Sequence, residues 1–242
     1  MDVHTGPLLL LVQANVAAPH EAAFNTWYYN HVPTLLEIPG YLWGRRYINL
    51  VGETKYLALY AITDESVLDS LLGPDPAKRH ALANHEFAKF EQLQGLSEVK
   101  INVYRQLSGT HLGHPLLQAD LPLSMVMLDC NDPAQEAAFN EWYTHSHVPN
   151  LVRIPGYVSG ARFRTIDHPA LAWLNMGPAY LAMYEWANTD CIPSLADPDQ
   201  MRAEAREEFA NWTAYGAGLA SNMSWNVYRP IAKHWPLHEG ST

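Results

Sequence analysis

Apolar residues along the chain occur in two patterns, short continuous runs and stretches with helical spacing, and the second pattern follows the first. Short continuous apolar runs at residues 8–12 and 125–128 are typical of buried β-strands. Each run is followed by a stretch with apolar residues at helical spacing, which in the first case are Phe24, Trp27 and Leu35. The pattern therefore predicts a strand followed by an amphipathic helix at two well-separated places in the chain.

The remaining elements follow each helix in the same order. We expect each helix to end at a His-Val-Pro segment, because proline disfavours the helical conformation in the residue before it. After the first of these helices, the apolar pattern predicts strands at 41–50 and 56–62, a helix at 77–93 and a strand at 99–106. In the second copy, it predicts strands at 157–166 and 180–186, a helix at 201–215 and a strand at 224–229.

This order recurs because the sequence itself is duplicated. Both halves contain the blocks Phe-Asn-x-Trp-Tyr, His-Val-Pro, Ile-Pro-Gly-Tyr and Asn-Val-Tyr-Arg in the same order. We place the first repeat at 1–107, a linker at 108–122, the second repeat at 123–230 and a C-terminal tail at 231–242. The linker contains Gly109, Gly113 and Pro115, which are typical of connecting segments.

The fold class follows from this order. Each repeat reads βαββαβ, the ferredoxin-like arrangement, in which helices cover only one face of an antiparallel sheet. The second face is apolar and must also be buried. We therefore predict an α+β protein in which two ferredoxin-like repeats close against each other as an intramolecular dimeric α+β barrel. This arrangement is compatible with a homodimer but does not require one.

The two repeats differ in length just before the His-Val-Pro block. Tyr28 precedes His31 by three positions, whereas Tyr143 precedes His147 by four. One extra residue rotates all later residues of a helix by about 100°, yet both copies resume the same block. We therefore predict a π-turn or an unwound turn between Trp142 and His147.

Composition narrows the function classes. Hydrophobic residues make up 48% of the chain and charged residues 17%, which suits a folded core. The net charge of −10 disfavours binding to nucleic acid and to anionic membranes. Cys130 and Cys191 show no disulfide or zinc spacing, and the run at 8–12 is too short for a membrane span or a signal peptide. A cytoplasmic location is the expectation.

The repeated blocks resemble those of the EthD-like dimeric α+β-barrel proteins. The resemblance covers both halves, and the second repeat has the usual spacing between Trp-Tyr and His. Related barrels include cofactor-free monooxygenases, muconolactone-type isomerases, polyketide cyclases and haem-binding enzymes. The resemblance implies a small pocket between each sheet and its helices, and a ligand that is aromatic or otherwise hydrophobic.

The histidines of the duplicated blocks are the first catalytic candidates. A histidine side chain generally titrates near neutral pH, so His31 and His147 could act as bases, and Tyr28 and Tyr143 could donate a hydrogen bond to an oxyanion. Alternatively, these residues anchor the helix ends, which would explain why both repeats have them.

Residues found in one repeat only form a second group. His85 is a catalytic candidate near the apolar stripe of its predicted helix, and Asp129, at the end of a strand, could act on a substrate or cap a helix. The second repeat also has an insertion at 165–178 that includes Trp173. We expect it to be either a lid over a pocket or a hairpin extension that packs against the other half.

Further candidates could bind the substrate. Arg46 and Arg162 could hold a carboxylate or phenolate, or pair with acidic neighbours for folding. Trp27 and Trp142 could form pocket walls or belong to the core. The pair His145 and His147 lacks further metal ligands, and the sequence has no phosphate-binding glycine loop. We therefore expect no metal and no dissociable cofactor, with haem as an alternative.

These features favour a cofactor-independent isomerase, cyclase or lyase. It would transfer protons through histidine on a small hydrophobic, aromatic or lactone-like metabolite. A monooxygenase or haem-dependent oxidative enzyme is the first alternative. A non-catalytic protein that binds the same kind of ligand is the second.

Overall fold

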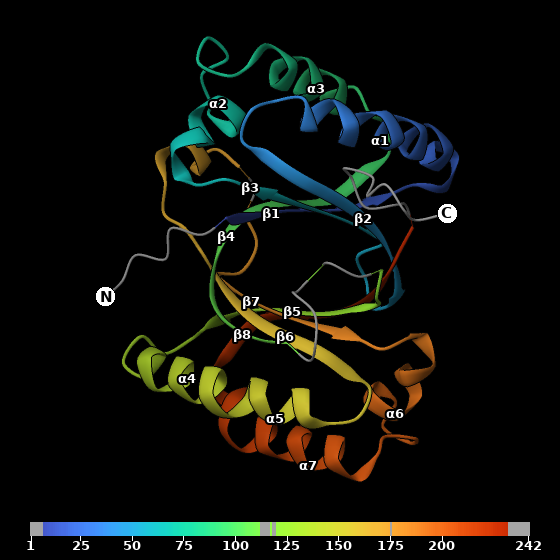
Figure 1. Ribbon diagram of the computed structural model, residues 1–242, viewed down its shortest axis with the longest axis vertical. Coiled ribbons are helices and arrows are strands. Elements are labelled where there is room, and N and C mark those ends of the chain that lie inside the picture. Colours follow the sequence, from blue (N-terminus) through green and yellow to red (C-terminus); the bar gives the residue numbers. More distant parts are fainter. Residues whose placement is uncertain (1–6, 112–116, 118–119, 175, 232–242) are drawn as a thin grey trace.

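The computed structural model describes residues 7–111, 117, 120–174 and 176–231. Within these residues, eight strands form one closed antiparallel barrel in the order β1-β3-β2-β8-β5-β7-β6-β4. The helices of the first repeat cover one outer side of the barrel and those of the second repeat cover the opposite side (Figure 1). The predicted α+β class and the intramolecular barrel are confirmed.

Each repeat supplies half of the barrel. The first contains β1 (Leu8–Val16), α1 (Glu21–Leu36), β2 (Tyr41–Val51), β3 (Tyr56–Ile62), α2 (Leu68–Leu72), α3 (Ala81–Glu91) and β4 (Leu96–His111). The second contains β5 (Leu123–Cys130), α4 (Glu136–Trp142), the π-helix η3 (Tyr143–His147), α5 (Val148–Arg153), β6 (Tyr157–Thr165), β7 (Tyr180–Trp186), α6 (Ile192–Ala196), α7 (Ala203–Asn211), the π-helix η6 (Trp212–Gly216) and β8 (Ala220–Pro230).

The halves are joined along two strand pairs. β2 pairs with β8. The C-terminal part of β4 pairs with β6, from Tyr104 opposite Thr165 to His111 opposite Ser159. The predicted start of the linker at residue 108 is therefore wrong, because 108–111 still belong to β4. Gly113 and Pro115 of the linker and the tail from 232 onward lie outside the described residues.

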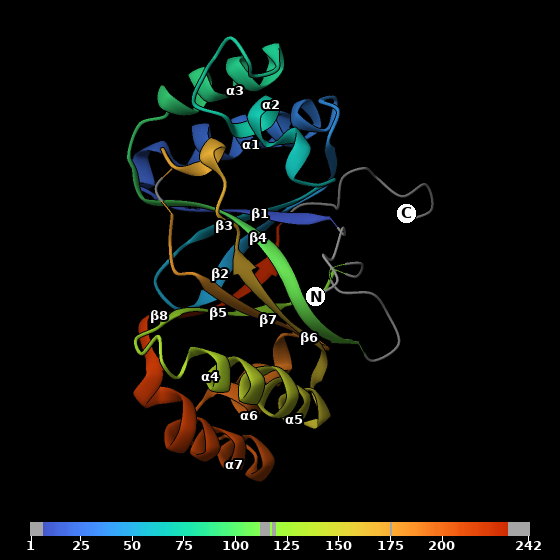
Figure 2. The ribbon, with the colours of Figure 1, turned by 90° about the vertical axis from the view of Figure 1, so that its left-hand side faces the viewer.

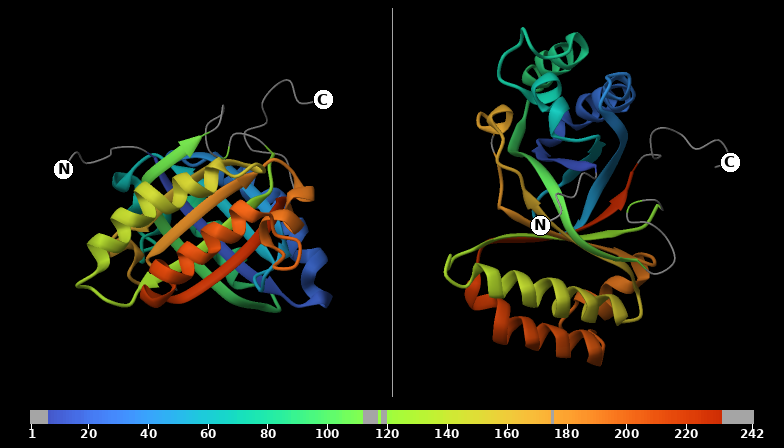
Figure 3. Two further views of the ribbon diagram at one scale, coloured as in Figure 1. Left: turned by 90° about the horizontal axis from the view of Figure 1, so that it is seen from below. Right: turned by 60° about the vertical axis from the view of Figure 1, so that its left-hand side comes forward.

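Alternate residues of each strand face two different cores. In β1, Leu9 and Leu11 pack inside the barrel, whereas Leu8 and Leu10 pack beneath the helices of the first repeat. The inner core contains side chains from the strands of both repeats, so the barrel interior is filled. Figure 3 shows the helices lying across the outer surface of the strands. A pocket between sheet and helices is therefore separate from the barrel interior.

The extra residue of the second repeat is accommodated as predicted. α1 is one continuous α-helix, whereas the corresponding segment of the second repeat is α4, the π-helix at Tyr143–His147 and α5. The π-helix takes up the inserted residue, and His147 resumes the position that His31 has in the first repeat.

The predicted end of the first helix is wrong. α1 continues through Pro33 to Leu36, and α5 continues through Pro149. A proline removes one helical hydrogen bond. Pro33 lies on the exposed side of α1, while Val32 and Leu35 on the other side are buried. We attribute the continuation of the helix to this packing, since burial of apolar side chains outweighs a local preference.

The insertion of the second repeat is an arm that packs against the first repeat. Ala170 and Leu171 belong to the core beneath the helices of the first repeat. The indole Nε1 of Trp173 donates to the Leu72 carbonyl at 2.8 Å. Figure 2 shows this segment reaching from the end of β6 to α2. Of the two expectations for this segment, the extension that packs against the other half is confirmed.

No helix in the described part of the chain is long and apolar enough to cross a membrane. The cytoplasmic location stays a prediction.

Candidate functional site

Each repeat has a pocket between its strands and its helices. In the first, Trp27, Tyr28 and His31 of α1 face Glu86 of α3. In the second, Tyr143 and His147 of the π-helix face Glu208 of α7. The two pockets are thus built from equivalent elements, and a histidine of the duplicated block lines each of them.

A histidine–glutamate pair is the central polar feature of both pockets. Nδ1 of His31 lies 2.6 Å from Oε2 of Glu86, and Nδ1 of His147 lies 2.7 Å from Oε1 of Glu208. Glu86 and Glu208 are almost completely buried, as is His147. A buried carboxylate that binds Nδ1 of an imidazole fixes the orientation of the ring.

This contact also fixes the tautomer. An ionised carboxylate can only accept hydrogen bonds, so Nδ1 must carry the proton that is donated to it. In a neutral imidazole the lone pair is then on Nε2. In the described part of the chain, Nε2 of His147 has no hydrogen-bond partner. It is therefore the atom at which this histidine could take a proton from a ligand.

The glutamates are held in the ionised form. Burial raises the pKa of Glu208, but hydrogen bonds with His147 and Asn211 more than offset this, and the net result is a lowered pKa. The pKa of Glu86 is lowered for the same kind of reason, by His31 and Lys89 against burial. Both carboxylates are therefore charged at neutral pH and can stabilise an imidazolium.

The tyrosines of the duplicated blocks stay protonated. Burial raises the pKa of Tyr28 to about 12 and also raises that of Tyr143. Each ring packs edge-on against the histidine of its repeat, at 5.4 Å between centroids for Tyr28 and 4.8 Å for Tyr143. A phenol with a raised pKa can donate a hydrogen bond but does not act as a base near pH 7.

Indole rings line the second pocket densely. Trp142 is stacked on His147 with 5.1 Å between the ring centroids, and Trp212 lies 5.5 Å from the same ring. Trp225 and Trp186 form the wall on the strand side. At the rim, Phe209 and Met223 are 62% and 52% exposed. The pocket therefore offers flat apolar surfaces and is accessible at its edge.

The pockets differ in size. The cavity of the first repeat is about 60 Å³ and that of the second about 210 Å³. A cavity of roughly 150 Å³ can hold benzene. The second pocket thus has room for an aromatic ring with substituents, and the first for a few water molecules.

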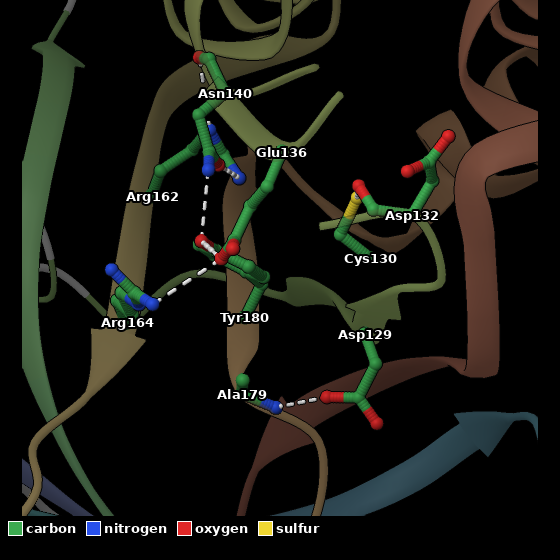
Figure 4. Close-up of polar contacts among 9 residues, drawn as sticks. All are labelled: Asp129, Cys130, Asp132, Glu136, Asn140, Arg162, Arg164, Ala179 and Tyr180. Carbon is green, nitrogen blue, oxygen red and sulfur yellow. Dashed lines mark hydrogen bonds and ion pairs between the residues drawn. The ribbon is translucent and has the colours of Figure 1, made fainter. Parts of the chain in front are cut away.

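Arg46 and Arg162 are not among the described residues that line the two pockets. Their guanidinium carbons lie over the rings of Tyr28 and Tyr143, at 4.1 and 4.2 Å from the centroids. Arg162 also donates to Asn140 at 2.8 Å, as Figure 4 shows. Each arginine thus fixes the first helix of its repeat to the sheet and supports the tyrosine, while its role in holding a carboxylate stays a prediction.

Three further candidates lie away from the pockets. His85 is exposed on α3, while the next residue, Glu86, faces inward, because one residue corresponds to about 100° of helix rotation. Asp129 accepts from the backbone N–H of Ala179 at 2.7 Å and ties two strand ends together (Figure 4). Trp173 binds α2 from outside rather than a substrate. These placements do not support the catalytic or binding roles expected for them.

Trp27 and Trp142 are placed differently. Trp27 stacks on His31 with 4.1 Å between the ring centroids and lines the first pocket. Trp142 stacks on His147 and packs against the core, but it is not among the residues that line the second pocket.

Sequence reasoning missed the glutamates, although a signal was present. When the last helices of the two repeats are aligned, His85 lies opposite Glu207 and Glu86 lies opposite Glu208. An acidic residue on the apolar face of an amphipathic helix, present in both repeats, is the pattern that would have identified Glu86 and Glu208.

The site offers little to a metal or a large cofactor. Within the described residues, no group of three or more histidine, cysteine, aspartate or glutamate side chains could hold a metal ion. The second cavity, at about 210 Å³, is smaller than the roughly 300–1,000 Å³ of pockets for drug-sized ligands. The haem alternative stays a prediction. That the protein needs no cofactor stays a prediction.

Comparison with known proteins adds information on the fold. No protein-family model matches the chain, and no curated protein matches it. An anthrone oxidase-like protein superposes with a TM-score of 0.66 at 9% sequence identity, covering 95% of this chain and 93% of that one.

Two candidate monooxygenases are also similar. The one from Fusobacterium nucleatum subsp. nucleatum has a TM-score of 0.61 at 9% identity, with 95% of this chain and 94% of that chain covered. The one from Lactobacillus acidophilus has a TM-score of 0.55 at 10% identity, with 93% and 94% covered. At such identities the likeness shows the fold alone. The chain therefore has the ferredoxin-like α+β-barrel fold of these proteins, and the narrower EthD-like resemblance stays a prediction.

Proposed function

We propose that the chain is an enzyme that removes a proton from a small, uncharged aromatic substrate bound in the pocket of the second repeat. The observation that carries this proposal is the His147–Glu208 pair at 2.7 Å, both residues buried, lining a cavity of about 210 Å³. A buried carboxylate–imidazole pair next to an apolar cavity is the arrangement that general base catalysis requires.

Each residue has a separate role in this step. Nε2 of His147 accepts the proton, and Glu208 stabilises the imidazolium that forms, without itself being protonated. The Tyr143 hydroxyl, which stays protonated, donates to the oxygen on which negative charge develops. The indoles of Trp212 and Trp225, which line the pocket, bind the flat faces of the substrate.

The lining of the pocket supports an uncharged substrate. Among the described residues that line it, none is a lysine or arginine, and the guanidinium of Arg162 lies over the ring of Tyr143 and donates to Asn140. An anionic substrate would bring a second negative charge close to Glu208 without a cation to balance it.

Two outcomes are open to the deprotonated substrate. If His147 returns the proton to another atom of the substrate, the reaction is an isomerisation, a cyclisation or an elimination. This is our first choice, because it needs only the groups that the pocket contains. If the carbanion reacts with molecular oxygen, the protein is a cofactor-free oxygenase. The likeness to an anthrone oxidase-like protein and to candidate monooxygenases favours this as the second choice.

A panel of hydroxylated and lactone-type aromatics, followed by absorbance and by oxygen consumption, tests the proposal. With an active compound, we expect His147→Gln to abolish turnover and His31→Gln, its matched control, to retain it. Oxygen consumption that accompanies turnover identifies the oxygenase; turnover without it identifies the proton-transfer enzyme. Full turnover in His147→Gln would refute the assignment of the base, and binding without turnover of any compound would indicate a ligand-binding protein.

A further inference from the structure

The two histidine–glutamate pairs differ at one helix position. In α3, Lys89 donates from Nζ to Oε1 of Glu86 at 2.9 Å. In α7, the residue at the same place, Asn211, donates from Nδ2 to Oε2 of Glu208 at 3.1 Å. Both residues follow the glutamate by three positions and bind the oxygen that the histidine leaves open. One is a cation and the other is a neutral amide.

A second neutral donor strengthens the contrast. Asn150 of α5 donates to the same oxygen of Glu208, at 3.2 Å. The equivalent residue of the first repeat, Thr34, uses its hydroxyl to donate to the Asn30 carbonyl instead. Glu208 is thus held from two sides by amides, whereas Glu86 is held by a single ammonium group.

The other charged and titratable groups around the pairs correspond between the repeats. Around His31 these are, besides Glu86 and Lys89, the side chains of Tyr28, Tyr41, Tyr60 and Arg46. Around His147 they are, besides Glu208, the side chains of Tyr143, Tyr157, Tyr184 and Arg162. Arg46 and Arg162 cover the tyrosines at nearly equal distances, 4.1 and 4.2 Å. The two arginines therefore occupy equivalent places. Lys89, which has Asn211 as its counterpart, is the charged group in direct contact with one glutamate that the other repeat lacks.

A cation on the carboxylate acts against protonation of the histidine. An ammonium next to the glutamate compensates its negative charge and repels a developing imidazolium. In the first repeat the pKa of His31 is lowered, chiefly by burial, and Arg46 and Lys89 act in the same direction against Glu86. An amide orients the carboxylate equally well and leaves its charge available.

We infer that Asn211 is a positioning residue, which holds Glu208 without neutralising it and thereby leaves the full charge of this carboxylate to His147. Lys89 shares Glu86 with His31 and weakens the equivalent pair. The residue three positions after the glutamate is thus the place at which the two repeats have become different. The inference rests on the proposed function, because it concerns the same base, His147.

Exchange of the two residues tests the inference without knowledge of the substrate. We would follow the imidazole Cε1–H signals of the full-length chain by NMR between pH 4.5 and 9, assigned with His31→Gln and His147→Gln. In Asn211→Lys, the titration midpoint of His147 should move to lower pH by about 0.5 to 1 unit, because a cation now contacts Glu208. In Lys89→Asn, that of His31 should move to higher pH by a similar amount.

Matched variants separate charge from position. Asn211→Leu removes the hydrogen bond without adding a charge and should move the midpoint of His147 less than Asn211→Lys does. Lys89→Met removes the charge and should act on His31 as Lys89→Asn does. Because the Lys89 side chain is 43% exposed, both of its variants are expected to fold and keep the test valid if Asn211→Lys does not.

The outcomes distinguish this inference from the proposed function. If neither midpoint moves in Asn211→Lys and Lys89→Asn, or if both move in the same direction, the inference is wrong. If both move as expected but His147→Gln still turns over substrate, the proposed function is wrong, while the role of position 211 in holding the charge of the pair stands. With an active substrate, Asn211→Lys should also lower kcat and shift the acidic limb of its pH profile to lower pH.

Discussion

The pocket of the first repeat and that of the second are lined by an equivalent histidine, glutamate and tyrosine, yet they differ in size and in what packs beside them. Phe87 of α3 corresponds to Phe209 of α7. Phe87 is packed against Trp173, with 5.6 Å between ring centroids, and lines a cavity of about 60 Å³. Phe209 is 62% exposed at the rim of a cavity of about 210 Å³.

The cover of the first pocket comes from the second repeat. The arm that follows β6 crosses to α2 and α3 and packs Trp173 against Phe87, beside the guanidinium of Arg79 from the first repeat. The corresponding turn between β2 and β3 is shorter and binds Asn226 of β8 instead. The repeat whose helices carry this arm is also the one with the smaller cavity. The larger pocket of the second repeat is therefore the one to which we assign the proposed function.

Loss of the base should produce the largest effect. Replacement of His147 by Gln keeps the side chain polar but removes the proton acceptor, and we expect turnover to fall by about 10²- to 10⁴-fold. The same change at His31 should alter turnover by less than about twofold, since the cavity beside it, at about 60 Å³, is too small for an aromatic ring. Steady-state kinetics of both variants measure this directly, and equal losses in the two would break the comparison between the halves.

Loss of the carboxylate should have the next largest effect. Glu208→Gln can still bind Nδ1 but cannot stabilise an imidazolium, so kcat should fall by roughly 10- to 100-fold with little change in KM. Glu86→Gln is the matched control in the first repeat. A rise in KM with unchanged kcat would instead mean that Glu208 only shapes the pocket.

Removal of the arm contact should open the first pocket. Trp173→Ala deletes the packing on Phe87 and the hydrogen bond to the Leu72 carbonyl, and should lower the free energy of unfolding by about 1–2 kcal/mol. Urea denaturation measures the loss, and binding of a small aromatic dye measures the opening. The control is Tyr215→Ala, an exposed aromatic in the second repeat, for which we expect a smaller loss of stability. Equal stability and no new dye binding in Trp173→Ala would show that the arm is not the cover.

The smallest effect concerns pH. Burial lowers the pKa of His31 in the folded chain below the usual value of about 6.5. Between the lowered pKa and about pH 6.5, the unfolded chain therefore binds a proton that the folded chain does not bind. Stability should therefore fall as pH decreases from about 6.5, by less than about 1 kcal/mol per pH unit. Urea denaturation at several pH values should show a shallower dependence in His31→Gln. An unchanged slope would mean that His31 titrates alike in both states.

Much of the fold could be predicted because it follows local patterns. The strands at 56–62 and 180–186 have the predicted bounds, and the length difference before His147 correctly predicted a π-turn. The end of β4 could not be predicted, because the residues at 108–111 show no apolar strand pattern and become strand only through pairing with β6 of the other repeat. The continuation of α1 through Pro33 likewise depends on tertiary packing.

The site was harder to predict than the fold. The duplicated blocks identified His147, Tyr143 and Trp142, but a predicted helix start at 77 instead of Ala81 left the inward face of α3 undefined. Neighbouring positions on a helix point about 100° apart, so His85 was chosen where Glu86 faces the pocket. The role of Trp173 depends on a contact between repeats, which no local pattern contains.

Binding of a neutral aromatic probe tests the central claim most directly. We would add 1-naphthol to the protein with isotopically labelled methionine methyl groups and histidine rings and record NMR spectra. The signals of Met223 and His147 should shift with saturation while that of His31 stays unchanged, because the second pocket alone has room for the ring. Shifts at His31 with none at Met223 and His147 would contradict the account.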